Sequence, residues 1–285
     1  IKILAKLDIA EQRLPQDGRL QIYADYFSPE IDCRVSTLPT LYGEKAVIRL
    51  LNTSSNELEL EQIGFTPIQL RIVKQALSQT HGLILVCGPT GSGKTRTLYS
   101  FLKYLNREHL NLCSIEDPIE IRLPGVNQVA YHPKAGLDFG LIIRALLRQD
   151  PDVMMIGEIR DRDTAMLAIQ AAQTGHLVLS TIHARNALGC IERLENLGIE
   201  RHAIIDNALF ISSQRLIKRI DSSQAGGRLA VHEVLEFSPS ICTAIQASKG
   251  VREIEEIAQS EGFKTMQEGV QLLAKKGIVK DSYLI

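Results

Sequence analysis

The chain has 285 residues, of which 45% are hydrophobic, so it can form one large or two ordinary domains with a real core. Its 32 Lys and Arg residues nearly balance 33 Asp and Glu residues, so no net charge draws the whole molecule toward nucleic acid or an anionic membrane. No apolar stretch approaches the roughly twenty residues of a membrane-spanning helix, and no signal peptide leads the chain.

The five cysteines are dispersed and form no Cys-x-x-Cys pair, which is typical of reduced thiols rather than of a disulfide framework or a zinc site. We therefore expect a cytoplasmic protein whose contact with a membrane is peripheral or made through partners. Because the chain opens on Ile1 instead of a methionine, we also expect it to be N-terminally truncated.

Residues 1–52 contain three short alternating segments, at 19–23, 32–36 and 45–51, separated by turn-forming residues. They predict strands of a small sheet. The polar stretch 52–56 predicts a linker, so we expect a first small domain and its linker to occupy residues 1–56.

After a predicted helix at 67–78, strands and helices alternate along the chain. This rhythm predicts an α/β fold, with right-handed crossovers and a parallel sheet covered on both faces. The tail from about 238 onward looks helical. The predicted strands are 83–87, 111–116, 153–157 and 177–182, and the helices between and after them are 93–106, 138–149, 161–174 and 187–196.

The most informative motif follows the strand 83–87 directly and reads Gly-Pro-Thr-Gly-Ser-Gly-Lys-Thr. Its glycines let backbone N–H groups turn toward phosphate oxygens at the positive end of the next helix. Lys94 is expected to reach the β and γ phosphates, and the Thr95 hydroxyl to bind Mg²⁺. The predicted nucleotide-binding residues are Gly88, Pro89, Thr90, Gly91, Ser92, Gly93, Lys94 and Thr95.

Acidic residues follow two of the other predicted strands. Glu158 ends the strand 153–157, where a carboxylate can activate the attacking water or hold Mg²⁺ through its hydration shell. Glu116, Asp117 and Glu120 follow the strand 111–116, and we interpret them as groups that position water or surround Mg²⁺. The alternative for these three acids is a solvated turn with Asp-Pro as breaker.

Histidines and arginines complete the set of candidates. His176 and His183 flank the strand 177–182, so they are either γ-phosphate sensors or structural hydrogen-bonding groups. Phosphoryl transfer also needs a cation, often from a neighbouring subunit. Arg144 and Arg148 lie four apart on one predicted helix, and Arg13, Arg19, Arg34 and Arg49 belong to the first domain; these residues alone do not show which of them touch nucleotide.

Taken together, these motifs resemble the secretion ATPases of type II secretion and type IV pilus assembly. The resemblance rests on the phosphate loop, Glu-Asp-Pro-Ile-Glu, Leu-Arg-Gln-Asp-Pro-Asp-Val-Met-Met-Ile-Gly-Glu-Ile-Arg-Asp and Thr-Gly-His-Leu-Val-Leu-Ser-Thr-Ile-His. The opening Leu-Asp-Ile-Ala-Glu-Gln-Arg-Leu-Pro-Gln-Asp-Gly-Arg and the following Asp-Cys-Arg-Val-Ser-Thr-Leu-Pro-Thr-Leu-Tyr-Gly-Glu belong to it as well. It covers about residues 5 to 220.

The resemblance implies a homo-hexameric motor that uses ATP and Mg²⁺ and works with inner-membrane platform and docking proteins of a pilus or secretion machine. It implies a small PAS-like α/β domain, a RecA-like P-loop ATPase core at 57–220 and a C-terminal helical subdomain at 221–285. By the same resemblance, the catalytic set is Glu158, Glu116, Asp117, Glu120, His176, His183, Arg34, Arg49, Arg144 and Arg148, with Glu116 and Glu158 near the Mg²⁺.

Two departures from the family pattern stand out. The four-cysteine zinc module carried by many members after the segment matching 214–220 is absent, because residues 221–227 lead directly to Arg228, so we expect no zinc. The longer N-terminal region that docks onto the inner-membrane partner is not in this chain.

Three alternatives remain open. A pilus retraction motor is disfavoured by Gln149, where Glu is expected, and by the missing Ala-Ile-Arg-Asn-Leu tail. A DNA translocase is disfavoured by the balanced charge and by the lack of a basic, aromatic-rich stretch, so we expect no direct nucleic-acid binding. A non-hydrolysing paralogue is disfavoured because Lys94, Thr95 and Glu158 are all present. The sequence does not identify the cargo.

Overall fold

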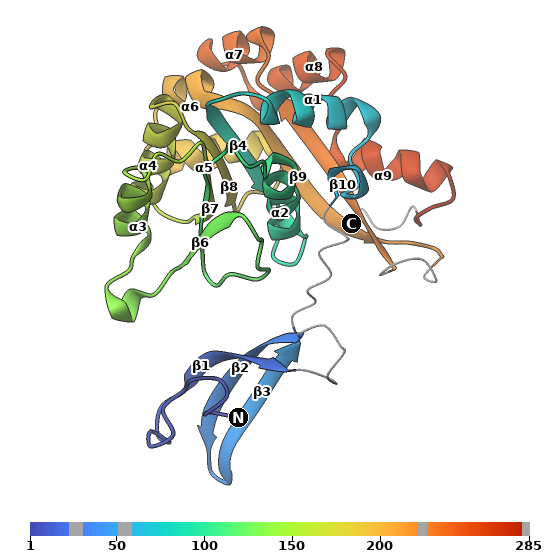
Figure 1. Ribbon diagram of the computed structural model, residues 1–285. Coiled ribbons are helices and arrows are strands. Elements are labelled where there is room, and N and C mark those ends of the chain that lie inside the picture. Colours follow the sequence, from blue (N-terminus) through green and yellow to red (C-terminus); the bar gives the residue numbers. More distant parts are fainter. Residues whose placement is uncertain (23–30, 51–58, 222–226, 281–285) are drawn as a thin grey trace. The chain divides into compact units, whose positions relative to one another are not determined.

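A computed structural model describes residues 1–22, 31–50, 59–221 and 227–280 (Figure 1). The chain forms two compact units. The small unit comprises Ile1–Glu57 and Glu120–Arg122, and the large unit comprises Leu58–Ile119 and Leu123–Ile285. The predicted linker at 52–56 lies outside the described residues.

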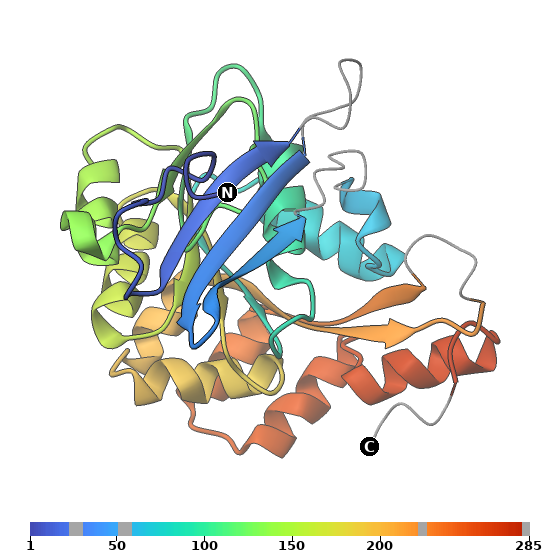
Figure 2. The same ribbon diagram turned by 90° about the horizontal axis from the view of Figure 1, so that it is seen from below.

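The small unit is built on a three-stranded antiparallel sheet in the order β1-β2-β3 (Figure 2). Its strands are Gln16–Ile22, Ile31–Thr40 and Gly43–Leu50, so the predicted small sheet is present. Its buried cluster is formed by Ala5, Leu20, Cys33 and Val35. The described part of this unit contains no α-helix.

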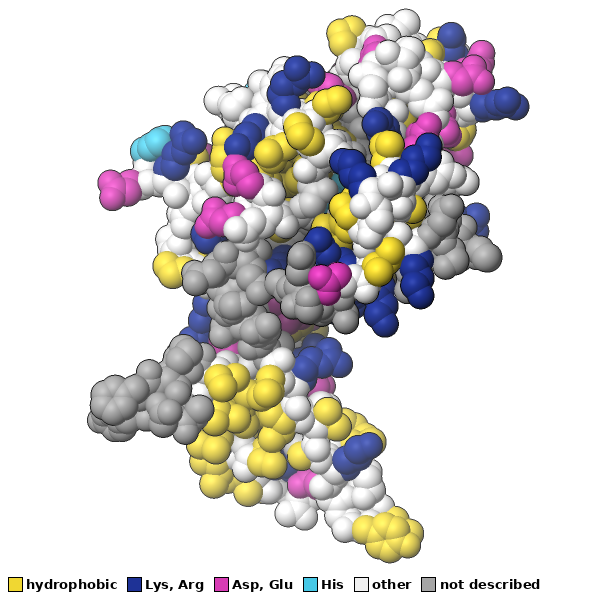
Figure 3. Space-filling view, turned by 90° about the vertical axis from the view of Figure 1, so that its right-hand side faces the viewer, with side chains coloured by type: hydrophobic (Ala, Val, Ile, Leu, Met, Phe, Trp, Pro, Cys, Tyr) yellow, Lys and Arg dark blue, Asp and Glu magenta, His cyan; other side chains and the backbone are white. Residues whose placement is uncertain are grey.

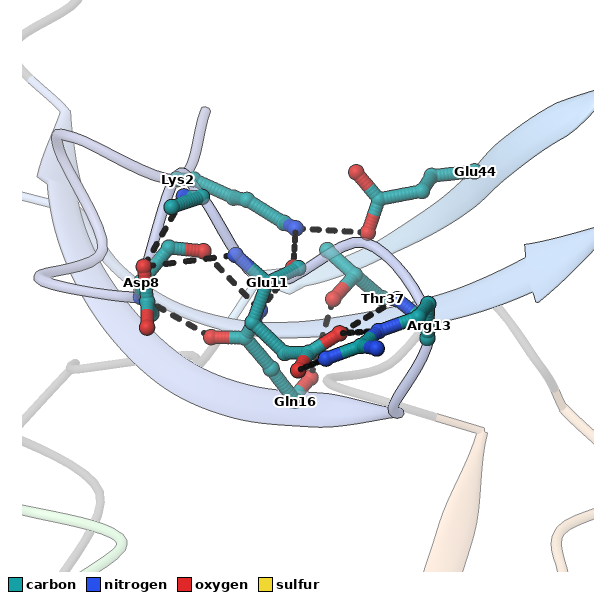
Figure 4. Close-up of polar contacts among 8 residues, drawn as sticks. Lys2, Asp8, Glu11, Arg13, Gln16, Thr37 and Glu44 are labelled. Carbon is teal, nitrogen blue, oxygen red and sulfur yellow. Dashed lines mark hydrogen bonds and ion pairs between the residues drawn. The ribbon is translucent and has the colours of Figure 1, made fainter.

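Polar contacts hold the segment before β1 against the sheet (Figure 4). Lys2 Nζ donates to the Glu11 carbonyl at 2.6 Å and pairs with Glu44 of β3 at 2.6 Å. Gln16 Nε2 donates to the carbonyls of Asp8 and Glu11 at 2.9 and 2.8 Å. The segment and the sheet therefore form one folded unit.

The large unit contains a seven-stranded sheet in the order β10-β9-β4-β8-β7-β5-β6. All neighbouring pairs are parallel except β10 and β9, which form a long antiparallel hairpin at one edge (Figure 2). The strands are β4 (Gly82–Cys87), β5 (Leu112–Glu116), β6 (Val126–Ala130), β7 (Val153–Ile159), β8 (Leu177–Ile182), β9 (Ala208–Lys218) and β10 (Arg228–Glu236).

Helices cover both faces of this sheet (Figure 1). On one face, α2 packs through Phe101, which meets Phe210 of β9 edge-on at 6.2 Å between ring centroids. On the other, the main buried cluster joins the sheet to α3 through α8. The helices are α1 (Pro67–Leu77), α2 (Lys94–Leu105), α3 (Phe139–Leu146), α4 (Arg162–Gln173), α5 (Ala187–Asn196), α6 (Arg201–Asn207), α7 (Pro239–Gln246), α8 (Val251–Ser260) and α9 (Met266–Lys275), with short 3-10 turns at Leu60–Gln62 and Pro133–Ala135.

The expected α/β fold with a largely parallel, covered sheet is therefore confirmed. The expected C-terminal subdomain at 221–285 is not a separate compact unit, because β10 pairs with β9 inside the same sheet. The three helices after β10 pack onto that sheet, with Val270 of α9 buried against Val231 of β10. No described helix is long and apolar enough to cross a membrane.

Candidate active site

The phosphate loop lies between the buried strand β4 and the start of α2. Gly88, Gly91 and Gly93 have positive φ values of 140°, 79° and 91°, a backbone region that side chains with a Cβ rarely adopt. A Cβ on Gly88 would also lie 2.3 Å from the Gln214 carbonyl oxygen, so this glycine is required by space as well as by conformation. The loop has the tight turn that a phosphate cradle needs.

Two buried polar groups of the loop are suited to an anion. The Ser92 hydroxyl is buried and makes no hydrogen bond within the described structure. Lys94 is buried, and its Nζ donates to the carbonyls of Gly88 and Pro89 at 2.9 and 3.1 Å. Burial lowers the pKa of Lys94, whereas the nearby charge of Glu158 acts in the opposite direction. These residues fit a phosphate group.

Gln214 supports the loop from behind. It lies on β9, is almost fully buried, and accepts a 2.7 Å hydrogen bond from Thr97 of α2. A Cβ on Gly93 would lie 2.9 Å from its Nε2 atom. The sequence did not single out Gln214 as a site residue, because its role depends on the pairing of β9 beside β4.

Glu158 projects from an irregularity near the end of β7. The β7–β8 register passes from Ile156 opposite Ser180 to Ile159 opposite Ile182, so β7 has one extra residue. Such a bulge redirects a side chain. A Cβ on Gly157 would lie 2.9 Å from the Ile115 carbonyl oxygen, so only glycine fits before Glu158.

The Glu158 carboxylate binds two residues at the carboxyl edge of the sheet. His183, which follows β8, places Nε2 3.1 Å from Glu158 Oε1. Arg160 donates from Nε to Glu158 Oε2 at 2.9 Å and pairs through Nη1 with Asp117 at 3.3 Å. The structure thus brings together Glu158, His183 and Asp117, and it adds Arg160, which sequence reasoning had passed over although it lies two residues after Glu158.

Glu116 occupies a buried polar network. Its carboxylate accepts hydrogen bonds from Tyr99, from Ser114 Oγ at 2.7 Å and from Gln128 Nε2 at 3.0 Å. These donors stabilise the carboxylate away from bulk water. Glu120 instead groups with the small unit, so the three acids of the predicted set do not form one cluster.

His176 is separated from His183 by the length of β8. It precedes the amino end of the strand, and its Nδ1 lies 2.9 Å from the Ala171 carbonyl and 3.2 Å from Thr174 Oγ1. Because the phosphate loop follows the carboxyl end of β4, His176 lies at the opposite edge of the sheet. These contacts match the structural role that the sequence left open.

Arg144 and Arg148 also differ from expectation. The helix α3 ends at Leu146, three residues earlier than predicted, so only Arg144 is helical. Asp150, before Pro151, has a positive φ of 47°, which is incompatible with a longer helix. Both arginines are exposed, Arg148 Nη1 donates to the Arg144 carbonyl at 2.8 Å, and no described contact joins them to the phosphate loop.

In the small unit, three arginines form one row across the sheet. Arg19 of β1 lies opposite Arg34 of β2, which lies opposite Arg49 of β3. Residues directly opposite in antiparallel strands share a face, and like charges there repel. Two buried nitrogens of Arg19, Nε and Nη2, have no hydrogen-bond partner among the described residues. Arg19, left undecided by the sequence, therefore joins Arg34 and Arg49 in this arginine row.

Binding of a Mg²⁺ ion to this site would depend on the phosphates of a bound nucleotide. Among the described residues, no three His, Cys, Asp or Glu side chains gather in a way that could hold a metal ion. Mg²⁺ usually binds through one or two protein groups together with phosphates and water. The exposed hydroxyl of Thr95, beside the loop, fits such a role.

Comparison with known proteins agrees with this geometry. The family model described as "Type II/IV secretion system protein" matches residues 1–282. The "Protein transport protein HofB homolog" of Escherichia coli is 41% identical over 318 residues, covering 100% of this chain and 68% of that protein. The "Type IV pilus assembly ATPase PilB" of Thermus thermophilus is 40% identical over 317 residues, covering 98% of this chain and 35% of that protein.

The solved structure of the "Pilus Retraction Motor PilT and Bound ADP" superimposes with a TM-score of 0.80 at 28% identity, covering 94% of this chain and 76% of that one. This similarity confirms the RecA-like P-loop architecture of the large unit. Because the family model matches residues 1–282 and these relatives cover 98 to 100% of the chain, the chain belongs to the type II/IV secretion system protein family.

Proposed function

We propose that this chain is the catalytic part of a hexameric ATPase that powers assembly of a type IV pilus or a type II secretion pseudopilus. The main support is the pairing of Glu158 with His183 and Arg160 at the sheet edge that carries the phosphate loop. A carboxylate at this edge can position and activate the water that attacks the γ phosphate. Membership of the type II/IV secretion system protein family supports the coupling of that hydrolysis to mechanical work.

In this proposal, the Gly88–Thr95 loop binds the ATP phosphates. The turn of the loop directs backbone N–H groups and the Ser92 hydroxyl toward phosphate oxygens, which would satisfy that buried hydroxyl. Lys94 exchanges its bonds to the loop carbonyls for bonds to the β and γ phosphates. Thr95 would hold Mg²⁺, which would neutralise phosphate charge.

Glu158 is the proposed base that orients and activates the attacking water. The bulge of β7 directs it, and Arg160 and His183 fix its two oxygens separately. A carboxylate in this position can accept a proton from the attacking water. Asp117 orients Arg160 from the other side, and buried Glu116 supports the end of β5.

The arginine row would supply the remaining positive charge. Arg19, Arg34 and Arg49 present three guanidinium groups on one face of the small sheet. An anion would relieve their repulsion, and the γ phosphate is the anion that this reaction provides. His176, Arg144, Arg148 and Glu120 have no assigned role in this proposal.

We expect the motor to act in the cytoplasm at the inner membrane, through platform and docking proteins rather than through direct membrane or nucleic-acid binding. The resemblance to PilT makes pilus retraction the second candidate. The two directions can be separated by expressing this protein in strains that lack either the assembly or the retraction motor. Restored piliation in the first strain supports assembly, and restored twitching in the second supports retraction.

The basic test is turnover of Mg²⁺-ATP by the purified protein. We expect hydrolysis by the parent sequence and its loss in Lys94→Ala, because the phosphate loop loses its only lysine. Lys74→Ala, which removes an exposed ion pair with Glu61, is the matched control and should hydrolyse ATP normally. Equal turnover in the parent and in Lys94→Ala would contradict the proposal. Stimulation by DNA but not by a platform protein would favour a nucleic-acid translocase.

A further inference from the structure

A buried carboxylate outside the phosphate-loop site connects two helices that are far apart in sequence. Glu233 lies on β10 and is only 5% exposed. Its Oε1 accepts a 2.8 Å hydrogen bond from the backbone N–H of Ala187, the first residue of α5. Its Oε2 accepts a 3.1 Å bond from the N–H of Met266, the first residue of α9.

The α5 end of this connection leads directly to the catalytic group. Ala187 lies four residues after His183, which contacts Glu158. The same peptide unit is also held from the opposite side, because the Cys87 thiol donates to the Asn186 carbonyl at 3.5 Å. Cys87 is the last residue of β4, immediately before the phosphate loop. The Asn186–Ala187 peptide is thus fixed between the phosphate-loop strand and Glu233.

The two hydrogen bonds to Glu233 are charge-assisted and therefore stronger than hydrogen bonds between neutral groups. Each joins an ionised carboxylate to an N–H group at the start of a ten-residue helix, where the helix dipole favours negative charge. Burial raises the pKa of Glu233, and the two N–H groups and Arg215 act in the opposite direction. Breaking one bond would leave a poorly solvated carboxylate oxygen, so the two helix starts are coupled through one side chain.

A cavity adjoins this connection. A cavity of about 380 Å³ separates the region around Arg185 and Leu188 from Thr265 and Met266, and Glu233 lies in its wall. Arg215 of β9 and Glu255 of α8 also line it. Beside this cavity, the Glu233 carboxylate joins the start of α5 to the start of α9.

We propose that Glu233 is a positioning residue that holds the 183–186 loop, and through it His183, in place against Glu158 and transmits movements of α9 to that loop. The proposal rests on the proposed ATP hydrolysis. It gives the C-terminal helices a route to the active site, with Glu233 acting through backbone amides and touching neither nucleotide nor water.

The sharpest test replaces a single N–H group. Met266→Pro removes the hydrogen that Met266 donates to Glu233, and proline is well tolerated at the first position of a helix. Thr265, with φ −62° and ψ 158°, already has the extended backbone that a residue before proline prefers. Met266→Ala loses the same side chain but keeps the N–H group, so it is the matched control.

We expect Met266→Pro to lower kcat for ATP by about tenfold relative to Met266→Ala, the equivalent of one charged hydrogen bond. The KM for ATP should change by less than about twofold, because the phosphate loop is untouched. Hydrogen exchange of the Ala187 amide, measured without nucleotide, should accelerate about tenfold although its own partner atom is still present. A purely structural link would lower stability without this difference in kcat and exchange.

Glu233→Gln provides an independent variant, because an amide can accept only one of the two bonds. It should reproduce the loss of kcat, whereas Glu255→Gln, which removes a carboxylate from the same cavity, should not. Unchanged Ala187 exchange in folded Met266→Pro, or equal kcat in Met266→Pro and Met266→Ala, would overturn the proposal. If the parent protein hydrolysed no ATP, the proposed function would fail, but the exchange comparison would still test the coupling.

Discussion

The phosphate-loop edge of the large unit and the arginine row of the small unit contrast in how their charges are satisfied. At the phosphate-loop edge, Glu158 and Lys94 have protein partners at 2.9 to 3.1 Å. In the arginine row, no ion pair or hydrogen bond within the described structure accompanies the guanidinium groups of Arg19, Arg34 or Arg49. Glu158 and Lys94 are therefore held by other groups of the protein, whereas the described residues provide no such partner for these three guanidinium groups.

Exposure shows the same contrast. Every residue of β4 is buried, whereas every residue of β3 is exposed, including Val47, Ile48 and Leu50. Figure 3 shows hydrophobic side chains gathered on the small unit. An unpaired row of cations beside exposed apolar side chains is typical of a surface completed by another group or chain. The large unit thus pairs its candidate site residues internally, whereas the three arginines of the small unit have no described side-chain partner.

The largest effect should follow from breaking the paired edge. Glu158→Gln keeps the volume of the side chain but removes its proton-accepting charge, so we expect ATP hydrolysis to fall about a thousandfold. Nucleotide binding should persist, because the phosphate loop is unaltered, and the variant should retain ATP. Single-turnover hydrolysis and filter binding of labelled ATP measure the two quantities.

Glu61→Gln, which breaks an exposed ion pair with Lys74, is the control for loss of a carboxylate and should hydrolyse ATP at the parent rate. Native turnover in Glu158→Gln would exclude Glu158 as the base. The pairing of Glu158 in the large unit would then have no catalytic meaning, and the comparison with the small unit would lose its basis.

The large unit was the more predictable of the two from sequence. Strand β8 and helix α5 were predicted with their observed ends, because apolar runs and caps such as Asn186 are local signals. Strands β9 and β10 were not predicted as strands. Strand β10 pairs antiparallel to β9, and β9 pairs parallel to β4. The position of this hairpin in the sheet therefore depends on β4, which is far away in the chain. Gln214 and Glu233, which lie on them, were therefore missed as well.

The site followed the same rule. Glu158 and the phosphate loop were evident from strand-end motifs, whereas Arg160 became a candidate only when its contacts with Glu158 and Asp117 were seen. His176 and His183 look equivalent in sequence, but strand direction places them at opposite edges of the sheet. Arg19 was undecided until the strand register placed it opposite Arg34.

A smaller difference between the units should appear in their response to acid. All seven histidines belong to the large unit. His232 is buried between Ile63, Ser212 and the ring of Phe65, and burial lowers its pKa to about 4. The unfolded chain binds a proton at this residue near pH 6.5, whereas the folded chain does not until pH falls to about 4.

Stability should therefore decrease as pH falls through this window. We expect the free energy of unfolding to be about 2 kcal/mol lower at about pH 5 than at about pH 7.5, because His232 binds a proton only in the unfolded chain at the lower pH. Urea unfolding at the two pH values, followed by circular dichroism, measures the change. His232→Gln keeps a hydrogen-bonding side chain without this titration, so its pH dependence should be weaker by that amount. Identical pH dependence in parent and variant would contradict the interpretation.

Substitutions in the arginine row should have the smallest effect per residue. They should lower activity but should not lower stability. Arg34→Gln and Arg49→Gln should each lower kcat about tenfold, because each removes one cation that stabilises phosphate charge. Neither should destabilise the small unit, since removing one of several like charges on one face relieves repulsion of about 0.2 to 1 kcal/mol. Arg13→Gln, at an exposed arginine paired with Glu11, is the control and should change neither quantity.

Steady-state kinetics and thermal unfolding of the same preparations give both readouts for the arginine row. A variant that lost activity and stability together would show that the row supports the fold, and unchanged kinetics would remove it from the reaction. If the arginines bind an anion from outside the small sheet, such as the γ phosphate, the variants should lose activity while their stability stays equal or rises. That outcome would explain why Arg19, Arg34 and Arg49 occupy directly opposite positions in the three strands.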